Sequence, residues 1–227
     1  MKLKLIFVLI VIAVSATVIY PQCTPIDTAR LNKAYRELKK TPDSLDSQKN
    51  FFHAFPSTWM EFMLTYNNPC NARIYHFYMS KQIDLHLYAF QKMIPLIPDT
   101  IYCNKLINLG IGGKWDSGVS AALQRITSEV MNQKPRVMFI CLSKQTRGFQ
   151  LRFWQFYWSS SQKLDTNVAQ FRYLKNMFRA SMPEQVEIME TGFEFASEEF
   201  KMYTKYIPFV DFPYLYFGGR PHPLYYF

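Results

Sequence analysis

Apolar side chains recur at helical spacing along most of this sequence. Trp59, Phe62, Met63 and Tyr66 lie at i, i+3, i+4 and i+7, which places them on one face of an α-helix. Similar stripes appear in four other segments, which are residues 31–38, 83–94, 119–130 and 168–178. Stripes of this width are typical of helices that dock in a bundle. The pattern therefore predicts a mainly α fold, a bundle-like helical domain.

Polar residues with capping chemistry mark where several of these helices begin. Thr58 and Glu61 fit a capping box, in which the hydroxyl and the carboxylate bind backbone N–H groups of the first turn. Further helix starts are predicted at Asp43 or Ser44, at Asp99, at Asp116, at Asp165 and at Pro183.

Two parts of the chain give no clear helical period. Between Lys134 and Ser161, Pro135 favours a helix start, whereas Val137–Ile140 fits a buried strand equally well. From Ile207 to the C-terminus the chain has four prolines and many rings, so we expect an extended aromatic tail that wraps across the body. Because no repeat or linker divides the chain, residues 23–227 are predicted to form a single helical domain.

The N-terminus has the pattern of an export segment. Lys2 and Lys4 are followed by an uncharged, apolar run from Leu5 to Tyr20, as in a secretory signal. The run is 16 residues long, under the roughly 20 of a spanning helix, and no A-x-A cleavage site follows it. Residues 1–22 are therefore predicted to be a signal peptide or an N-terminal membrane anchor. Lipidation at Cys23 is disfavoured, because Gln22 replaces the small residue of a lipobox.

The four cysteines fit an exported chain, in which disulfides are allowed. Cys141 lies in the apolar run VMFICL and reads as a small buried hydrophobe. Cys70 and Cys103 lie near the ends of predicted elements, and they are the predicted disulfide pair. The absence of C-x-x-C counts against a structural zinc site.

Charge and ring content favour a binding role. Lys and Arg outnumber Asp and Glu by 26 to 17, which gives a net charge of +9. That excess suits an acidic protein, an anionic envelope polymer or a membrane surface. Nucleic acid is not expected as a partner, because the longest basic cluster is Lys39-Lys40. The 20 Phe, 15 Tyr and 4 Trp can fill a bulky core and leave some rings for recognition.

No local group of residues has the spacing of a catalytic, cofactor-binding or metal-binding motif. The glycine turn before Lys114 has Asn108 and Trp115 where a P-loop needs Gly and Ser or Thr, so it reads as a connection between helices. His53, His76, His86 and His222 are scattered and form no metal-binding pattern. No G-x-S-x-G is present. We therefore predict no catalytic, cofactor-binding or metal-binding residue, although a long-range site stays open.

The segment Asn50–Phe62 reads NFFHAFPSTWMEF. It is similar to an FFxAFPxTFxEF-like signature of uncharacterised small exported proteins of Bacteroidota. Gly112–Asp116 and Gly148–Tyr157 fit the same resemblance, which covers roughly the middle half of the chain. Some of these proteins resemble immunity proteins that protect a cell from antibacterial toxins. The resemblance implies no catalytic residue.

These observations favour an exported protein of the periplasm or outer envelope that works by binding a protein partner. Its most concrete form is an immunity protein that neutralises a toxin by occlusion, through aromatic anchors with a basic rim. The alternatives are an envelope enzyme, such as a peptidoglycan hydrolase, and a structural envelope component. The predicted binding surface comprises the tail residues Tyr214, Tyr216, Tyr225 and Tyr226.

Overall fold

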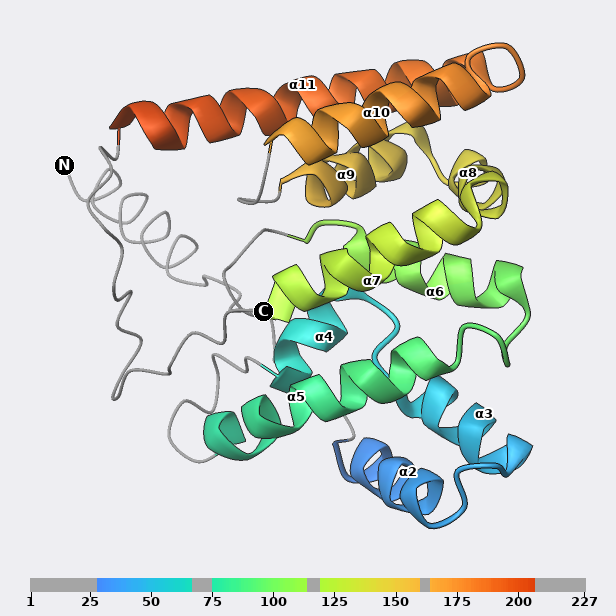
Figure 1. The fold of residues 1–227 in the computed structure, drawn as a ribbon. Helices are drawn as coiled ribbons and strands as arrows, with labels where there is room; N and C mark the ends of the chain where they lie inside the picture. The colour runs from blue at the N-terminus through green and yellow to red at the C-terminus, as the bar shows by residue number, and fades with distance from the viewer. Residues whose placement is uncertain (1–27, 67–74, 114–118, 160–163, 207–227) are drawn as a thin grey trace, which may run out of the picture.

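The described part of the chain is built from α-helices. The computed structural model describes residues 28–66, 75–113, 119–159 and 164–206, and within these ranges it has ten α-helices and no β-strand (Figure 1). The prediction of a mainly helical fold is confirmed. The helices are α2 Thr28–Lys40, α3 Leu45–Ala54, α4 Trp59–Tyr66, α5 Tyr75–Lys92, α6 Asp99–Gly110, α7 Val119–Gln133, α8 Pro135–Ser143, α9 Arg147–Trp158, α10 Leu164–Phe178 and α11 Pro183–Tyr206.

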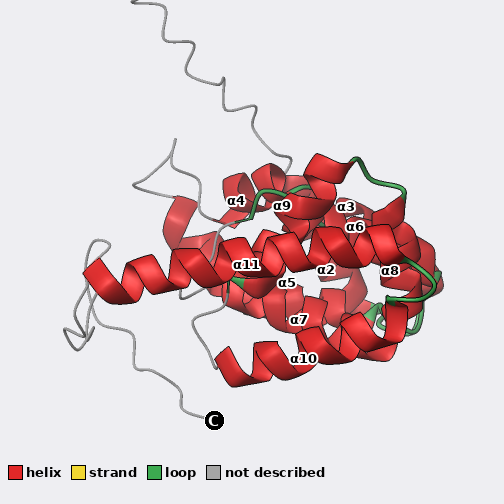
Figure 2. Cartoon of the chain, turned by 90° about the horizontal axis from the view of Figure 1, so that it is seen from above, coloured by secondary structure: helices red, strands yellow, loops and turns green. Residues whose placement is uncertain are grey.

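These helices stack from α2 and α3 at one end of the molecule to α10 and α11 at the other (Figure 1). The long helix α11 packs along α9, α6 packs against α8 and α9, and α2 packs against α3. Seen from above, α10 and α11 run across the end of the stack (Figure 2). Helix α9 therefore lies between α6 on one side and α11 on the other.

The apolar stripes of the sequence face the core. Leu123, Ile126 and Val130 of α7 are fully buried, and so is Phe90 of α5. Leu87, one turn before Phe90, is 2% exposed. The helical predictions for these segments are confirmed.

Aromatic rings make up two clusters within this core. In the first, Phe90 stacks on Phe55 with ring centroids 4.4 Å apart and on Tyr102 at 4.8 Å, which joins α3, α5 and α6. In the second, Phe139 of α8 stacks on Phe178 of α10 at 4.0 Å. The remaining rings of the second cluster are Phe153, Trp154, Tyr157, Trp158, Phe171 and Phe193. Most rings of the described residues therefore serve packing.

The capping predictions around α3 and α4 are confirmed. Ser44, rather than Asp43, caps α3, and its Oγ accepts a hydrogen bond from Ser47 N at 3.4 Å. At the start of α4, Thr58 Oγ1 accepts from Glu61 N at 3.2 Å. The Glu61 carboxylate accepts from Ser57 N at 2.7 Å, so the capping box reaches one residue further back than its usual form.

Lys105 completes the corner between α3 and α4. The carbonyl of Phe52 would accept from the backbone N–H of residue 56 if the helix continued, but Pro56 has no N–H. Lys105 of α6 donates to this carbonyl through Nζ, and its ammonium lies 4.7 Å from the centre of the Phe52 ring. Burial lowers the pKa of Lys105 to about 8, while the nearby Glu61 carboxylate acts in the opposite direction. A side chain distant in sequence thus replaces the donor that proline removes.

The ambiguous segment after Lys134 forms two helices, α8 and α9, separated by a short turn. Pro135 stands in the first turn of α8, where its missing N–H costs nothing. The alternative of a strand over Val137–Ile140 is wrong, because Met138, Phe139 and the following turn continue the helix to Ser143. The ring-rich segment after it forms α9, which is capped by the hydroxyl of Thr146.

Two predicted caps are wrong. Asp99 does not cap α6: Pro98 precedes the helix without a side-chain cap bond, and the Asp99 carboxylate binds Lys134 instead. That ion pair ties the start of α6 to the junction of α7 and α8. Asp165 lies inside α10, which begins at Leu164. The predicted cap Asp116 lies outside the described residues.

The predicted leader and tail are not tested by the structure. Residues 1–22 and the tail from Ile207 fall outside the described ranges. Among the helices that are described, none combines the length and apolarity needed to cross a bilayer.

The close packing of α9 against α11 can be tested at glycine. A Cβ added at Gly192 would lie 2.4 Å from Trp154 Cβ, so the helices would have to separate. We expect Gly192→Ala to lower the free energy of unfolding by about 1–3 kcal/mol, as overpacking does. The matched control is Gly148→Ala, where nothing lies within 4 Å of the added Cβ. Because alanine favours helix, this control should gain up to about 1 kcal/mol. Chemical denaturation measures both, and equal values for the two variants would contradict the contact.

Candidate interaction surface

The tail tyrosines predicted as a binding surface are not placed by the structure. Tyr214, Tyr216, Tyr225 and Tyr226 all lie outside the described residues. Their role stays a prediction.

The predicted disulfide is also untested. Cys70 lies outside the described residues, while Cys103 is a buried, free thiol on α6. Burial raises the pKa of Cys103 to about 12, with smaller contributions from its neighbours Cys141 and Asp99. Since Cys103 is fully buried, a bond to Cys70 would require residue 70 to enter the interior. Cys141 is buried on α8, as its apolar surroundings predict.

The glycine turn after α6 is a packing element in its described part. A Cβ at Gly110 would lie 2.9 Å from the Phe156 ring, and one at Gly113 would lie 2.5 Å from it. Gly112 has a φ of +80°, which favours glycine. These glycines therefore let the chain pass close to α9, in keeping with a connection between helices.

Over the described residues, no group of three or more His, Cys, Asp or Glu side chains is placed to hold a metal ion. Asp84 and His86, two residues apart in sequence, point in different directions: Asp84 is exposed and His86 is fully buried. His53 lies exposed in the last turn of α3.

A buried titratable pair links Tyr66 of α4 with His86 of α5. Tyr66 Oη lies 3.0 Å from His86 Nδ1, and the rings of Tyr35 and Phe51 meet the imidazole edge-on. His86 Nε2 has no hydrogen-bond partner. If the Tyr66 hydroxyl donates to Nδ1, the Nε2 proton is the one polar group of the pair that lacks an acceptor, and it faces aromatic rings. If Nδ1 donates instead, both the Tyr66 hydroxyl proton and the Nε2 lone pair lack a partner. Tyr66 therefore acts as the donor.

Burial keeps this pair uncharged. It lowers the pKa of His86 to about 4 and raises the pKa of Tyr66 well above its ordinary value. Because His86 is 0% exposed, no substrate can approach it from solvent. The pair is thus a neutral polar link between α4 and α5 within the core.

The outer surface offers a different kind of site where α5, α7 and α10 lie side by side (Figure 1). Gln91 of α5 donates to the Glu129 carboxylate of α7. On the other side of α7, Gln170 of α10 donates to Asn132 Oδ1 at 2.9 Å. Side-chain hydrogen bonds thus join the three helices into one continuous surface, which we name the α5–α7–α10 face.

Large apolar side chains stand exposed on this face. Tyr88, one turn before Gln91, is 61% exposed, and Tyr173, one turn after Gln170, is 49% exposed. Met177 follows Tyr173 by one further turn and is 42% exposed. Such side chains are enriched at protein interfaces. These side chains were not predicted as a binding surface from the sequence, although they lie off the apolar stripes of α5 and α10, which is a usable signal.

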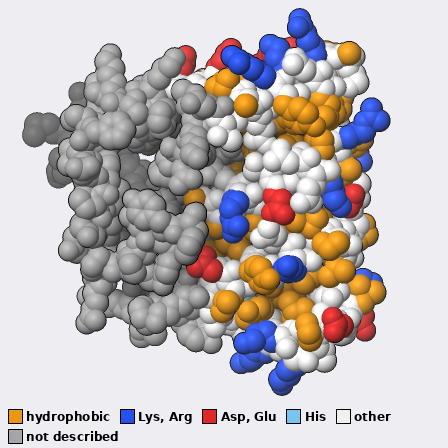
Figure 3. All heavy atoms as spheres, viewed as in Figure 1, with side chains coloured by type: hydrophobic (Ala, Val, Ile, Leu, Met, Phe, Trp, Pro, Cys, Tyr) orange, Lys and Arg blue, Asp and Glu red, His pale blue; other side chains and the backbone are white. Residues whose placement is uncertain are grey.

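Basic side chains accompany these apolar groups. Arg125, one turn before Glu129, is exposed on the outer side of α7, between α5 and α10. Lys92 Nζ lies 5.1 Å from the centre of the Tyr88 ring. The space-filling view shows hydrophobic and basic side chains interleaved on this side of the molecule (Figure 3). The arrangement has the chemistry of a protein-binding surface, with rings beside cations.

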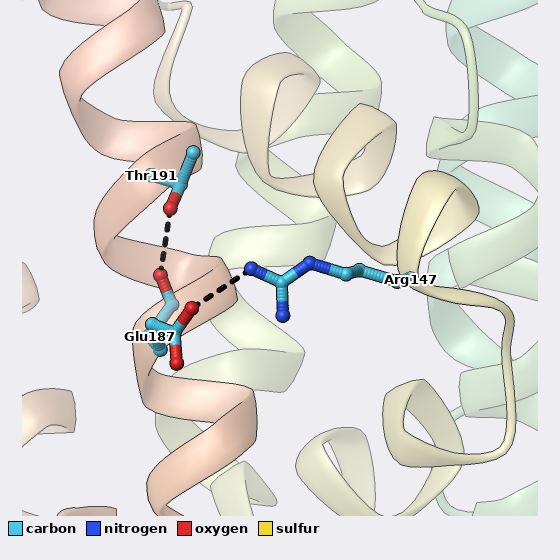
Figure 4. A network of polar contacts seen from close by, with 3 residues as sticks. All are labelled: Arg147, Glu187 and Thr191. Atoms are coloured by element: carbon cyan, nitrogen blue, oxygen red, sulfur yellow. Dashed lines mark hydrogen bonds and ion pairs between the residues drawn. The ribbon is translucent and has the colours of Figure 1, made fainter.

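A second polar area lies where α9 meets α11. Arg147 Nη2 lies 2.8 Å from Glu187 Oε1, and Thr191 donates to the Glu187 backbone carbonyl at 3.0 Å (Figure 4). Both charged side chains are more than half exposed, so solvent screens the pair. Glu194 and Glu198, further along α11, are exposed to solvent as well.

The buried imidazole predicts how stability depends on pH. The pKa of His86 lies near 4 in the folded chain and near 6.5 unfolded, so the unfolded state binds the proton first. The free energy of unfolding should fall as the pH drops from about 6.5 toward 4, by up to about 3 kcal/mol from this group. His86→Gln keeps a polar partner for Tyr66 but does not titrate. Urea unfolding between pH 6.5 and 4 should show that the free energy of unfolding falls more steeply with pH for the native chain than for His86→Gln. Parallel pH dependences for the two chains would contradict the low pKa of His86.

Comparison with known proteins adds no relative: no protein-family model, no curated protein and no solved structure matches the chain.

Proposed function

We propose that this protein is an exported, envelope-facing binding protein, and most concretely an immunity protein that neutralises an antibacterial toxin by covering it. The observation that carries the proposal is the α5–α7–α10 face, on which Tyr88, Tyr173, Met177 and Arg125 are exposed. A few rings and an arginine at the centre of an interface commonly dominate binding energy.

The rigidity of this face supports binding by occlusion. Its side chains stand on three helices that are packed on the core and joined by the Gln91–Glu129 and Gln170–Asn132 hydrogen bonds. Tyrosines on such a scaffold lose little conformational entropy when a partner binds. A preformed surface needs no rearrangement to cover its target.

The charge balance supports an acidic partner. The chain has a net charge of +9, and the face presents Lys92 and Arg125. Cations at the rim of an interface speed the encounter with an acidic protein, while desolvated rings slow its release. The partner that this surface fits is a protein with an acidic, partly apolar surface.

The envelope location rests on the N-terminal sequence. Lys2 and Lys4 before the apolar run Leu5–Tyr20 have the pattern of an export signal or anchor. A reporter active only outside the cytosol, fused to residues 1–30, tests this part of the proposal. Activity no greater than that of a leaderless fusion would exclude export.

Protection is the decisive test of the immunity role. The product of the adjacent gene is directed to the periplasm in cells that do or do not express this protein. We expect growth only where the protein is present. If the neighbour is harmless, or cells die although the protein is folded and exported, the immunity role is wrong. Peptidoglycan turnover by the purified protein would replace it with an enzymatic role.

Interface variants test where the partner binds. Tyr173→Ala should raise the dissociation constant about 30-fold, mainly through faster dissociation, because a desolvated ring is lost. Arg125→Gln should mainly slow association and weaken its dependence on salt. The matched controls are Phe195→Ala on α11, an equally exposed ring, and Arg136→Gln on α8. Surface plasmon resonance with the captured toxin separates the two rates. Control variants that weaken binding as much as the test variants would place the interface elsewhere.

A further inference from the structure

Helix α2 carries the most one-sided charge of the described helices. Its 13 residues include five basic side chains and one acidic side chain, Glu37. All five basic side chains are exposed, and they are Arg30, Lys33, Arg36, Lys39 and Lys40. We name this surface the basic face of α2.

The helix turns this face directly away from the core. Leu31, Ala34 and Leu38 are buried, and α2 packs chiefly against α3. At 100° per residue, Lys33 and Arg36 lie on the side of the helix opposite these three. The helix is therefore fixed by its apolar side, and its cations project into solvent.

The central cations of this face have no counterion within the structure. None of the three ion pairs found among the described residues uses Lys33, Arg36 or Lys40. Lys39 lies 5.9 Å from the centre of the Tyr35 ring, which is a weak contact for an exposed ammonium. Lys33, Arg36 and Lys40 thus lie side by side without an ion pair to any described residue.

The side chains of the basic face of α2 indicate which kind of partner it binds. None of the exposed large hydrophobic side chains of the described residues belongs to α2. A tight protein interface needs such anchors, whereas a fluid layer of phosphate groups requires only cations on long side chains. Charge complementarity without apolar anchors therefore favours a lipid surface over a protein.

The position of α2 in the chain agrees with this partner. It begins at Thr28, and the apolar run that we propose as an export or anchor segment ends at Tyr20. A linker of this length spans at most about 30 Å when fully extended. If residues 5–20 enter a membrane, α2 stays within reach of its headgroups.

We propose that the basic face of α2 docks on an anionic membrane surface, with Lys33, Arg36 and Lys40 against lipid phosphate groups. This surface is separate from the proposed toxin-binding face. Because α2 and α10 lie at opposite ends of the molecule (Figure 1), a docked chain presents α10 away from the lipid. Membrane docking through α2 does not depend on whether the partner of the α5–α7–α10 face is a toxin.

Vesicle flotation of the full chain tests the proposal. The probes are vesicles of phosphatidylcholine alone and vesicles that also contain phosphatidylglycerol. We expect the triple variant Lys33→Gln, Arg36→Gln, Lys40→Gln to lose affinity for the anionic vesicles by on the order of 100-fold at low salt, about fivefold per cation. Its affinity for the neutral vesicles should not change.

A charge-matched variant distinguishes the basic face from net charge. Arg136→Gln, Lys144→Gln and Arg179→Gln together remove three exposed cations from α8 and from the turns that follow α8 and α10. This variant should keep most of the affinity for anionic vesicles. The proposal would be overturned if both triple variants lost the same affinity for anionic vesicles. It would also be overturned if binding of the native chain did not depend on phosphatidylglycerol.

Lysine labelling provides a second readout that an inserted anchor cannot mask. On the full chain bound to anionic vesicles, acylation of Lys33 and Lys40 should slow several-fold relative to neutral vesicles and recover at high salt. Acylation of Lys144 should not change. Unchanged labelling of Lys33 and Lys40 would refute docking through α2. If added acidic protein, rather than lipid, protects them, the partner is a protein.

Discussion

The close approach of α9 to its two neighbours is the constraint on which the rest of the structure depends. Gly110 brings α6 against the rings of Phe153 and Phe156, and Gly192 brings α11 against Trp154. A side chain at either glycine would push the helices apart. Because α9 is so rich in rings, only neighbours without a Cβ at the contact can approach it this closely. Trp59 of α4 also reaches α9 here, with its ring centroid 5.8 Å from that of Phe156.

Polar groups inside this ring-filled core are matched with partners from distant helices. Gln124 of α7 donates to the Phe156 carbonyl at 2.6 Å, near the end of α9. Tyr102 of α6 donates to the Phe90 carbonyl of α5 at 3.2 Å. Such bonds stabilise little on balance, but a buried hydroxyl or amide group without a partner is costly. They therefore specify which helix ends lie together.

Much of the helical architecture could be predicted from the sequence, because apolar spacing and capping are local signals. Leu123, Ile126 and Val130 face the core as their spacing indicates, and Thr58 and Glu61 cap α4. The segment Val137–Ile140 could not be assigned, since a short apolar run fits a strand or a buried helix. Asp99 was misassigned as a cap because its true partner, Lys134, is brought close only by the fold.

The candidate surface was harder to predict than the helices. Tyr88 and Tyr173 differ from core rings only in the side of the helix that they occupy. Among the 39 aromatic residues of the chain, a few exposed rings are hard to identify from the sequence. They share one face with Arg125 because α5, α7 and α10 lie side by side, and no local sequence pattern predicts that arrangement. The tail tyrosines were favoured instead because prolines and rings stand out in a sequence.

The bond from Lys105 to the Phe52 carbonyl has a consequence for the order of folding. As the chain emerges from the ribosome or a translocon, residues up to Pro56 appear well before α6, so this carbonyl must first be satisfied by water. The α3–α4 corner can become dry only when α6 arrives and supplies the ammonium group. We therefore expect the corner and α6 to gain protection from hydrogen exchange together, as one cooperative unit rather than as a preformed N-terminal hairpin.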